Sequence, residues 1–442
     1  MGMSMAKDEA QPRRRRPIHR LRWWIGGMLF ASTVINYIDR QTLSTLAPFL
    51  KVQYHWTNSD YALLVISFRA AYAIGQFALG RVIDRVGTRL GMMAAVSCYS
   101  VVAMLTCFAS GLRSFAVFRF LLGLGESANW PAATKAVSEW FPKQERAWAV
   151  ALFDSGSSIG AAVAPAFVIW LYSRFGDWRP AFAVTGLLGL IWVVIWRGLY
   201  HSPENHPRLG DEERRMILDS RSADFAAPEV ENGPPPRLID LLKLRQTWGT
   251  IIARAFTDPV WFFITDWFMI YLVSKGFKPG STLIAFWIPF VAADLGNFSG
   301  GGFSSWLIGR GWPVGRARKA VVIFGGLGMM ALIPAIFVSN LFAIAGLFAF
   351  ATFAYAAFST MALVLPSDLY QSRSVATVSG LCGTAAGILT IGSTYLIGWI
   401  SDRYSFAPLL VASSIMPFIG AVLVLWLVRN TAASGQGVLR KI

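Results

Sequence analysis

The sequence predicts an all-α membrane protein with twelve transmembrane helices in two pseudo-symmetric six-helix bundles. Of its 442 residues, 55% are hydrophobic and only 14% are charged, whereas about a quarter of the residues in a soluble chain are charged. The stretches 341–365 and 408–428 are long enough to cross a bilayer, which requires about 20 apolar residues. Such runs recur in two sets of six, so we expect a lipid bilayer around the chain.

The apolar runs place the first six helices near residues 22–46, 60–80, 89–110, 114–136, 147–172 and 179–199. The second six are expected near residues 248–274, 282–307, 318–339, 341–366, 375–400 and 406–428. The polar stretch between the sets contains Gly233-Pro234-Pro235-Pro236 and is expected to hold a short amphipathic helix near 211–218. The predicted organisation is a basic tail (1–21), an N-terminal bundle (22–199), a linker (200–247), a C-terminal bundle (248–429) and a second tail (430–442).

The net charge of +16 is compatible with nucleic-acid binding in principle, because basic patches attract phosphates. The cations, however, gather in short connections between the apolar runs, as at Lys143 and Arg146, and Arg13 to Arg16 precede the first run. This is the positive-inside pattern of membrane proteins. It predicts that both termini and the linker are cytoplasmic, and that nucleic acid is not a partner.

The cysteines and histidines predict no metal or redox chemistry. Cys98, Cys107 and Cys382 lie in apolar runs without paired spacing, which is typical of buried cysteines that act as small apolar residues. The four histidines are scattered near or beyond the expected membrane boundaries. Without a nucleophile–base pair, a metal spacing or a cofactor loop, we expect neither a cofactor nor an enzyme.

The two halves show weak internal similarity. Small residues fill 155–160 in the fifth expected helix and 379–384 in the eleventh. Such residues let helix backbones approach closely, and two repeated halves with a site between them form an alternating-access carrier. Helix packing alone explains the small residues equally well.

The connection after the second helix carries a specific motif. It reads Gly80-Arg81-Val82-Ile83-Asp84-Arg85-Val86-Gly87-Thr88-Arg89 and resembles the G-x-x-x-D-R-x-G-x-R motif of the major facilitator superfamily. The resemblance implies a gating role for Gly80, Asp84, Arg85, Gly87 and Arg89. Glycine permits tight helix contact, and the charged residues can form a breakable ionic latch at the cytoplasmic end. The alternative is a solvated basic turn.

Further blocks narrow the resemblance, which covers nearly the whole chain. They are Asn36-Tyr37-Ile38-Asp39-Arg40, Arg119, Gly125-Glu126, Glu139-Trp140-Phe141-Pro142, Glu145-Arg146 and the segment 153–161. These blocks are similar to the anion:cation symporter family, and most of all to bacterial hexuronate transporters. The chain departs from that family at Asp154, where asparagine is usual, and at Arg69, where a charge is not expected.

The resemblance implies a proton-coupled symporter of the bacterial inner membrane, which imports glucuronate or galacturonate by alternating access as a monomer. Other sugar acids or carboxylates remain open as substrates, among them galactonate, glucarate and aromatic acids. Coupling to sodium, exchange, and an anion sensor that moves no substrate are further alternatives.

Ionisable residues inside a membrane are costly and therefore mark functional sites. Arg119 and Glu126 are seven residues apart, so they share one face of a helix. Burial favours the neutral form of a carboxyl group, which suits Glu126 to proton coupling, and the resemblance assigns Arg119 as its modulator. A purely structural charge network is the alternative.

We expect Arg40 to bind the substrate carboxylate, because a guanidinium donates two parallel hydrogen bonds. Asp39 is then a second proton site that controls Arg40, unless the two residues only hold helices together. Arg69, Tyr72 and Gln76 share a face of the second helix. Arg69 either adds a cation for a diacid or a larger anion, or pairs with Asp154.

The remaining expected substrate contacts come from both halves, and for those in the second half packing is the competing explanation. With Arg40 and Arg119, the full expected set of substrate contacts is Tyr37, Tyr72, Gln76, Trp267, Asn297 and Ser367. The sequence assigns no role to Asp258, Asp266 and Asp294.

Overall fold

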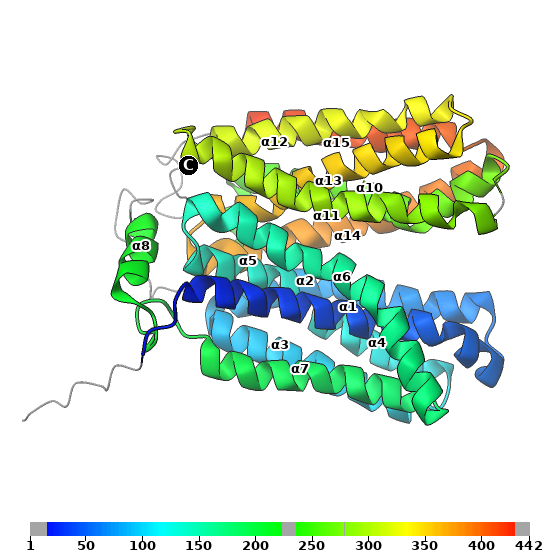
Figure 1. The fold of residues 1–442 in the computed structure, drawn as a ribbon, viewed down its shortest axis with the longest axis horizontal. Helices are drawn as coiled ribbons and strands as arrows, with labels where there is room; N and C mark the ends of the chain where they lie inside the picture. Colours follow the sequence, from blue (N-terminus) through cyan, green and yellow to red (C-terminus); the bar gives the residue numbers. More distant parts are fainter. Residues whose placement is uncertain (1–15, 223–235, 278, 429–442) are drawn as a thin grey trace, which may run out of the picture.

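A computed structural model describes residues 16–222, 236–277 and 279–428 (Figure 1). Most of the expected N-terminal tail, part of the linker and the expected C-terminal tail therefore lie outside the described residues. Within them the chain is built from α-helices and short 3-10 turns. The long helices run roughly parallel along the longest axis of the molecule.

The first six predicted helices are confirmed. They are α1 (Leu21–Tyr54), α2 (Asn58–Val86), α3 (Thr88–Leu105, continued by the turn Thr106–Phe108), α4 (Leu112–Glu126) with α5 (Asn129–Trp140), α6 (Lys143–Phe175) and α7 (Arg179–Leu199). The fourth is broken, whereas the sequence suggested one continuous helix over 114–136. Pro131 lacks an N–H group, so the carbonyl of Ser127 loses its helical partner. The break leaves Glu126 at the end of α4.

The second six predicted helices are also confirmed. They are α10 (Arg245–Ser274), α11 (Pro279–Gly309), α12 (Val314–Gly328, continued by the turns Met329–Leu332 and Pro334–Ile336), α13 (Leu341–Leu369), α14 (Ser372–Arg403) and α15 (Ala407–Leu427). Eight helices among the described residues are by themselves long and apolar enough to cross a membrane. Two that fall short, α1 and α10, carry charged residues in the middle of their length.

The linker contributes two short helices, α8 (Asp211–Ser222) and α9 (Leu238–Leu242). The expected amphipathic helix is therefore present as α8. Glu213 of α8 accepts hydrogen bonds from the backbone N–H groups of Leu21 and Arg22 at 3.0 and 3.3 Å. Arg22 also forms ion pairs with Glu213 and with Glu145 of α6, both at 2.6 Å. These contacts fasten α8 to the N-terminal bundle.

The connection before α8 folds back onto the same bundle. His206 donates a hydrogen bond from Nε2 to the carbonyl oxygen of Leu199 at 2.9 Å, and packs edge-on against Trp140. Burial lowers the pKa of His206, so its neutral form is favoured. Because α8 lies at one end of the parallel helices (Figure 1), we call this end the linker end.

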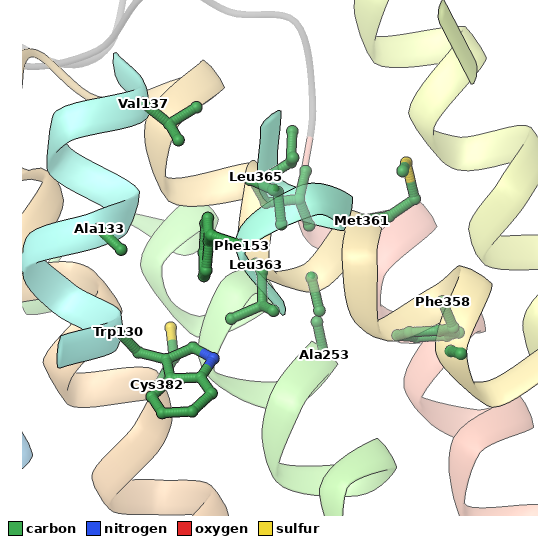
Figure 2. Packing of buried hydrophobic residues seen from close by; sticks show 14 of the residues in the cluster. Trp130, Ala133, Val137, Phe153, Ala253, Phe358, Met361, Leu363, Leu365 and Cys382 are labelled. Carbon is green, nitrogen blue, oxygen red and sulfur yellow. The ribbon is translucent and has the colours of Figure 1, made fainter. Parts of the chain in front are cut away.

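The two halves meet along a seam of apolar side chains. Figure 2 shows part of it, with Trp130, Ala133 and Val137 of α5 facing side chains of α10, α13 and α14. In the same seam α2 packs against α14, and α6 packs against α11. The backbones of α2 and α14 come very close at Gly80, where an added Cβ atom would lie 2.4 Å from the carbonyl oxygen of Ala376.

Gly80→Ala should therefore open the seam. The clash is with backbone, so it cannot be relieved by a side-chain rotation, and overpacking costs about 1–3 kcal/mol. Cys382 is fully buried in this seam, and its rate of maleimide labelling in a Cys98→Ser, Cys107→Ser background should rise severalfold. Gly27→Ala is the control, because nothing lies within 4 Å of a Cβ atom there. Equal labelling rates in the two variants would contradict the expectation.

Candidate functional site

A cavity of about 440 Å³ lies between the two halves. That volume is in the range of small-molecule sites, about 300–1,000 Å³. Six of the predicted site residues line it together: Tyr37, Arg40, Tyr72, Gln76, Arg119 and Asn297. The cavity is thus bordered by α1, α2 and α4 from one half and by α11 from the other.

Arg40 is the cation of the N-terminal wall. Its guanidinium carbon lies 4.7, 4.9 and 5.0 Å from the ring centres of Tyr37, Phe68 and Tyr72. Aromatic faces attract cations and hold the flat guanidinium in place. The side chain remains 24% exposed, so part of the guanidinium is accessible from the cavity.

Glu126 lies behind Arg40 and is fully buried. Its Oε2 atom accepts hydrogen bonds from Nε and Nη2 of Arg40 at 3.3 and 3.1 Å. Its Oε1 atom has no hydrogen-bond partner among the described residues. Glu126 can therefore hold a proton on Oε1, and neutralising the carboxylate would weaken its hold on Arg40. The break between α4 and α5 places Glu126 at the last residue of α4.

Asp39 and Arg119 lie in the same interior. Asp39 is 2% exposed, and neither carboxylate oxygen has a well-formed hydrogen bond to a described residue. A buried ion without partners is costly, so Asp39 is suited to bind a proton. Arg119 donates from Nη1 to the carbonyl oxygen of Arg40 at 3.3 Å. Its Nη2 atom is buried without a described partner.

The lining also carries acidic groups, to which the sequence assigned no substrate contact. Asp154 of α6 accepts a hydrogen bond from the indole N–H of Trp130 at 3.2 Å. Arg254 and Asp258, one turn apart on α10, form an ion pair at 2.6 Å. All four residues line the cavity. Asn297 accepts a hydrogen bond from Thr360 at 3.1 Å.

Two of the predicted substrate contacts lie away from the cavity lining. Trp267 packs against Phe406 with ring centres 6.4 Å apart. Ser367 lies near the end of α13, and its carbonyl oxygen accepts a hydrogen bond from Arg146 at 2.9 Å. The side chain of Asp266 lies outside the described residues. Arg69 does line the cavity, with its guanidinium 5.4 Å from the ring centre of Phe262.

Asp84 joins the two halves at the linker end. It accepts hydrogen bonds from Lys135 at 3.0 Å and from the backbone N–H groups of Ala376 and Thr377 at 3.3 and 2.6 Å. The cation that meets Asp84 is thus Lys135, where the sequence suggested the arginines of the motif. Arg85 is exposed, and Arg89 donates to the carbonyl of Arg197 within its own half. Gly87 ends α2 with a φ of 89°, which favours glycine.

A second network at this end was missed by the sequence analysis. Asp368 of α13 pairs with Arg146 of α6 at 3.2 Å and with Arg318 of α12 at 2.9 Å. Arg318 also donates to the carbonyl of Lys143 at 2.8 Å. Each of the three charged side chains is at most 1% exposed. The sequence showed only that these residues lie near helix ends. Cations at such positions are already explained by the positive-inside pattern, so they gave no sign of a network.

The two networks close the cavity at the linker end. In the other direction the lining residues extend along α2 as far as Tyr61, close to the first residue of that helix. A central site between two helical halves, with one end sealed by breakable polar contacts, has the geometry that an alternating-access carrier requires.

Comparison with known proteins identifies the family. The model of the Major Facilitator Superfamily matches residues 29–388. The chain belongs to this superfamily. It is a transporter and not an enzyme, and the similarity to hexuronate transporters expected from its motifs is confirmed.

Two relatives and one solved structure illustrate the similarity. The transporter is 31% identical to the hexuronate transporter of Escherichia coli K12, over 95% of this chain and 96% of the relative. It is 29% identical to the D-galactonate transporter of Escherichia coli O6:H1, over 98% of this chain and 100% of the relative. Its fold matches the proton:xylose symporter XylE with a TM-score of 0.71, at 14% identity over 94% of this chain and 98% of that chain.

Proposed function

We propose that this transporter imports a hexuronate, glucuronate or galacturonate, together with protons. The observation that carries the proposal is the pair formed by Arg40 and Glu126 at the cavity wall. Arg40 provides a planar donor for a carboxylate, and Glu126 competes for the same guanidinium. The hexuronate and galactonate transporters among the relatives support a sugar acid as the substrate.

The cycle follows from this competition. With the linker end closed, the cavity loads from the opposite end, which we assign to the periplasm of a bacterial inner membrane. Protons on Glu126 and Asp39 loosen the hold on Arg40, so the guanidinium becomes available to the substrate carboxylate. The gate at Asp84 and at Asp368 then separates at the linker end, which we assign to the cytoplasm. Loss of the protons there returns Arg40 to Glu126 and releases the anion.

Arg40→Ala tests the substrate role directly. Loss of a charged, bidentate contact costs about 1.5–3 kcal/mol, so we expect uptake of labelled galacturonate and glucuronate at low concentration to fall at least tenfold. The assay uses proteoliposomes with an inward proton gradient. Arg179→Ala is a matched control, since that arginine forms an exposed ion pair with Asp177 at 3.3 Å.

Each result decides a different point. Gradient-driven accumulation by the wild type that is lost in Arg40→Ala supports the proposal. Accumulation that persists in Arg40→Ala would show that Arg40 does not bind the substrate carboxylate. No accumulation of either hexuronate by the wild type moves the search to galactonate, which the similarity to the D-galactonate transporter favours as the second candidate.

A further inference from the structure

One wall of the cavity connects a cation to an anion through two aromatic rings. The guanidinium of Arg40 lies 4.7 Å from the ring centre of Tyr37. That ring contacts Trp130 edge-on, with centres 6.0 Å apart, and the indole N–H of Trp130 donates to Oδ1 of Asp154 at 3.2 Å. All four side chains line the cavity. A bound molecule therefore meets a positive group at one end of this wall and a negative group at the other.

The hydrogen bond from Trp130 orients the Asp154 carboxylate and occupies only one of its two oxygen atoms. Its Oδ2 atom accepts no hydrogen bond from a described residue, and the side chain faces the cavity. An ionised carboxylate only accepts hydrogen bonds, so a ligand must bring donors to this position. Arg254 on the neighbouring wall is already paired with Asp258. The Oδ2 atom of Asp154 is therefore available to accept a hydrogen bond from a ligand in the cavity.

A sugar acid matches this polarity. Its carboxylate accepts hydrogen bonds at one end, and its hydroxyl groups donate them at the other. Placing the carboxylate on Arg40 directs the hydroxyl end along Tyr37 and Trp130 towards Asp154. The reverse orientation would bring two carboxylates together and leave Arg40 facing hydroxyl groups.

We propose that Asp154 is a specificity-determining residue that accepts hydrogen bonds from the substrate hydroxyl groups at the end opposite the carboxylate, with Trp130 as its positioning residue. This inference rests on the proposed sugar-acid site. It adds the reason why a hydroxylated acid is selected over a plain carboxylate. Proton coupling stays with the groups behind Arg40.

Asp154→Asn is the central test, because it keeps the oxygen that meets Trp130 and removes the charge. In proteoliposomes the KM for galacturonate should rise roughly fivefold, since hydrogen bonds to charged acceptors are about twice as strong as neutral ones. The maximal rate and the number of protons per substrate should not change. Tetrahydropyran-2-carboxylate, which has the ring and the carboxylate but no hydroxyl groups, should inhibit uptake equally well in both proteins.

Two further variants separate recognition from structure. Trp130→Phe keeps an aromatic ring but removes the N–H donor, and its KM should rise in the same direction by a smaller factor. Asp177→Asn neutralises an exposed acid outside the cavity lining, which pairs with Arg179 at 3.3 Å, and we expect wild-type values. An equal loss of affinity for both ligands in Asp154→Asn, an unchanged KM, or a changed proton count would each overturn the inference.

Failure of the proposed function gives a different result. Wild-type protein that accumulates neither hexuronate would refute the proposed substrate. The same comparison would then be made with galactonate and hexanoate, which share a six-carbon chain and a carboxylate and differ in hydroxyl groups. Selection of galactonate that is reduced in Asp154→Asn would support the inference, and equal affinity for the two acids in wild-type protein would overturn it.

Discussion

Glu126→Gln is expected to abolish proton-driven accumulation of substrate. Glutamine has nearly the same shape as a protonated glutamate, but it cannot release a proton. It also cannot pull Arg40 away from the substrate as a carboxylate does, because the ion pair at 3.1 Å is lost. We expect accumulation in proteoliposomes with an inward proton gradient to fall at least a hundredfold.

Exchange of labelled for unlabelled substrate should survive in Glu126→Gln. This counterflow requires binding and the conformational change but no net proton movement. Its rate with equal substrate on both sides should stay within about threefold of wild type. Glu145→Gln is the control: it changes an acid that pairs with Arg22 at the linker end, and it should retain accumulation. Gln76→Glu would not serve as a control, because it adds a charge to the cavity. Accumulation in Glu126→Gln at the wild-type level would show that Glu126 does not couple proton movement to transport.

Asp368→Ala is expected to shift the transporter away from the state that is closed at the linker end. The substitution removes the buried carboxylate that Arg146 and Arg318 share, and breaking such a buried pair costs about 3–5 kcal/mol. The two arginines then repel each other across the seam. A shift of this size changes the balance of two states by at least a hundredfold.

Spin labels report this shift directly. Val86 and Trp312 are exposed residues at the linker end, one from each half, and cysteines there can carry nitroxide labels. We expect a longer distance to dominate the distribution in Asp368→Ala. Asp177→Ala, which removes an exposed ion pair between the α6–α7 connection and Arg179, should leave the distribution unchanged. A distribution in Asp368→Ala that matches wild type would show that the Asp84 contacts alone keep this end closed.

Much of the site could be anticipated, because intramembrane charges are rare. Arg40, Arg119 and Glu126 stood out as charged residues within apolar runs, and the structure brings them together around one wall. Helical spacing placed Tyr72 and Gln76 on one face, and the family resemblance implied that they contact the substrate. Trp267 and Ser367 lie elsewhere, because the sequence did not reveal which face of α10 and α13 meets the cavity.

By itself, the sequence determined the twelve helices, the separation into two sets of six and the family. The physical reason is local: a helix that crosses lipid satisfies its backbone by its own hydrogen bonds and needs about 20 mostly apolar residues in succession, and the motif at 80–89 is contiguous. Tertiary structure decided the partners of the charged residues. Asp368 meets Arg146 and Arg318 across 222 and 50 positions of the chain, and Asp84 meets the backbone of α14. Such contacts depend on how whole helices pack against one another, and spacing within one helix does not record that.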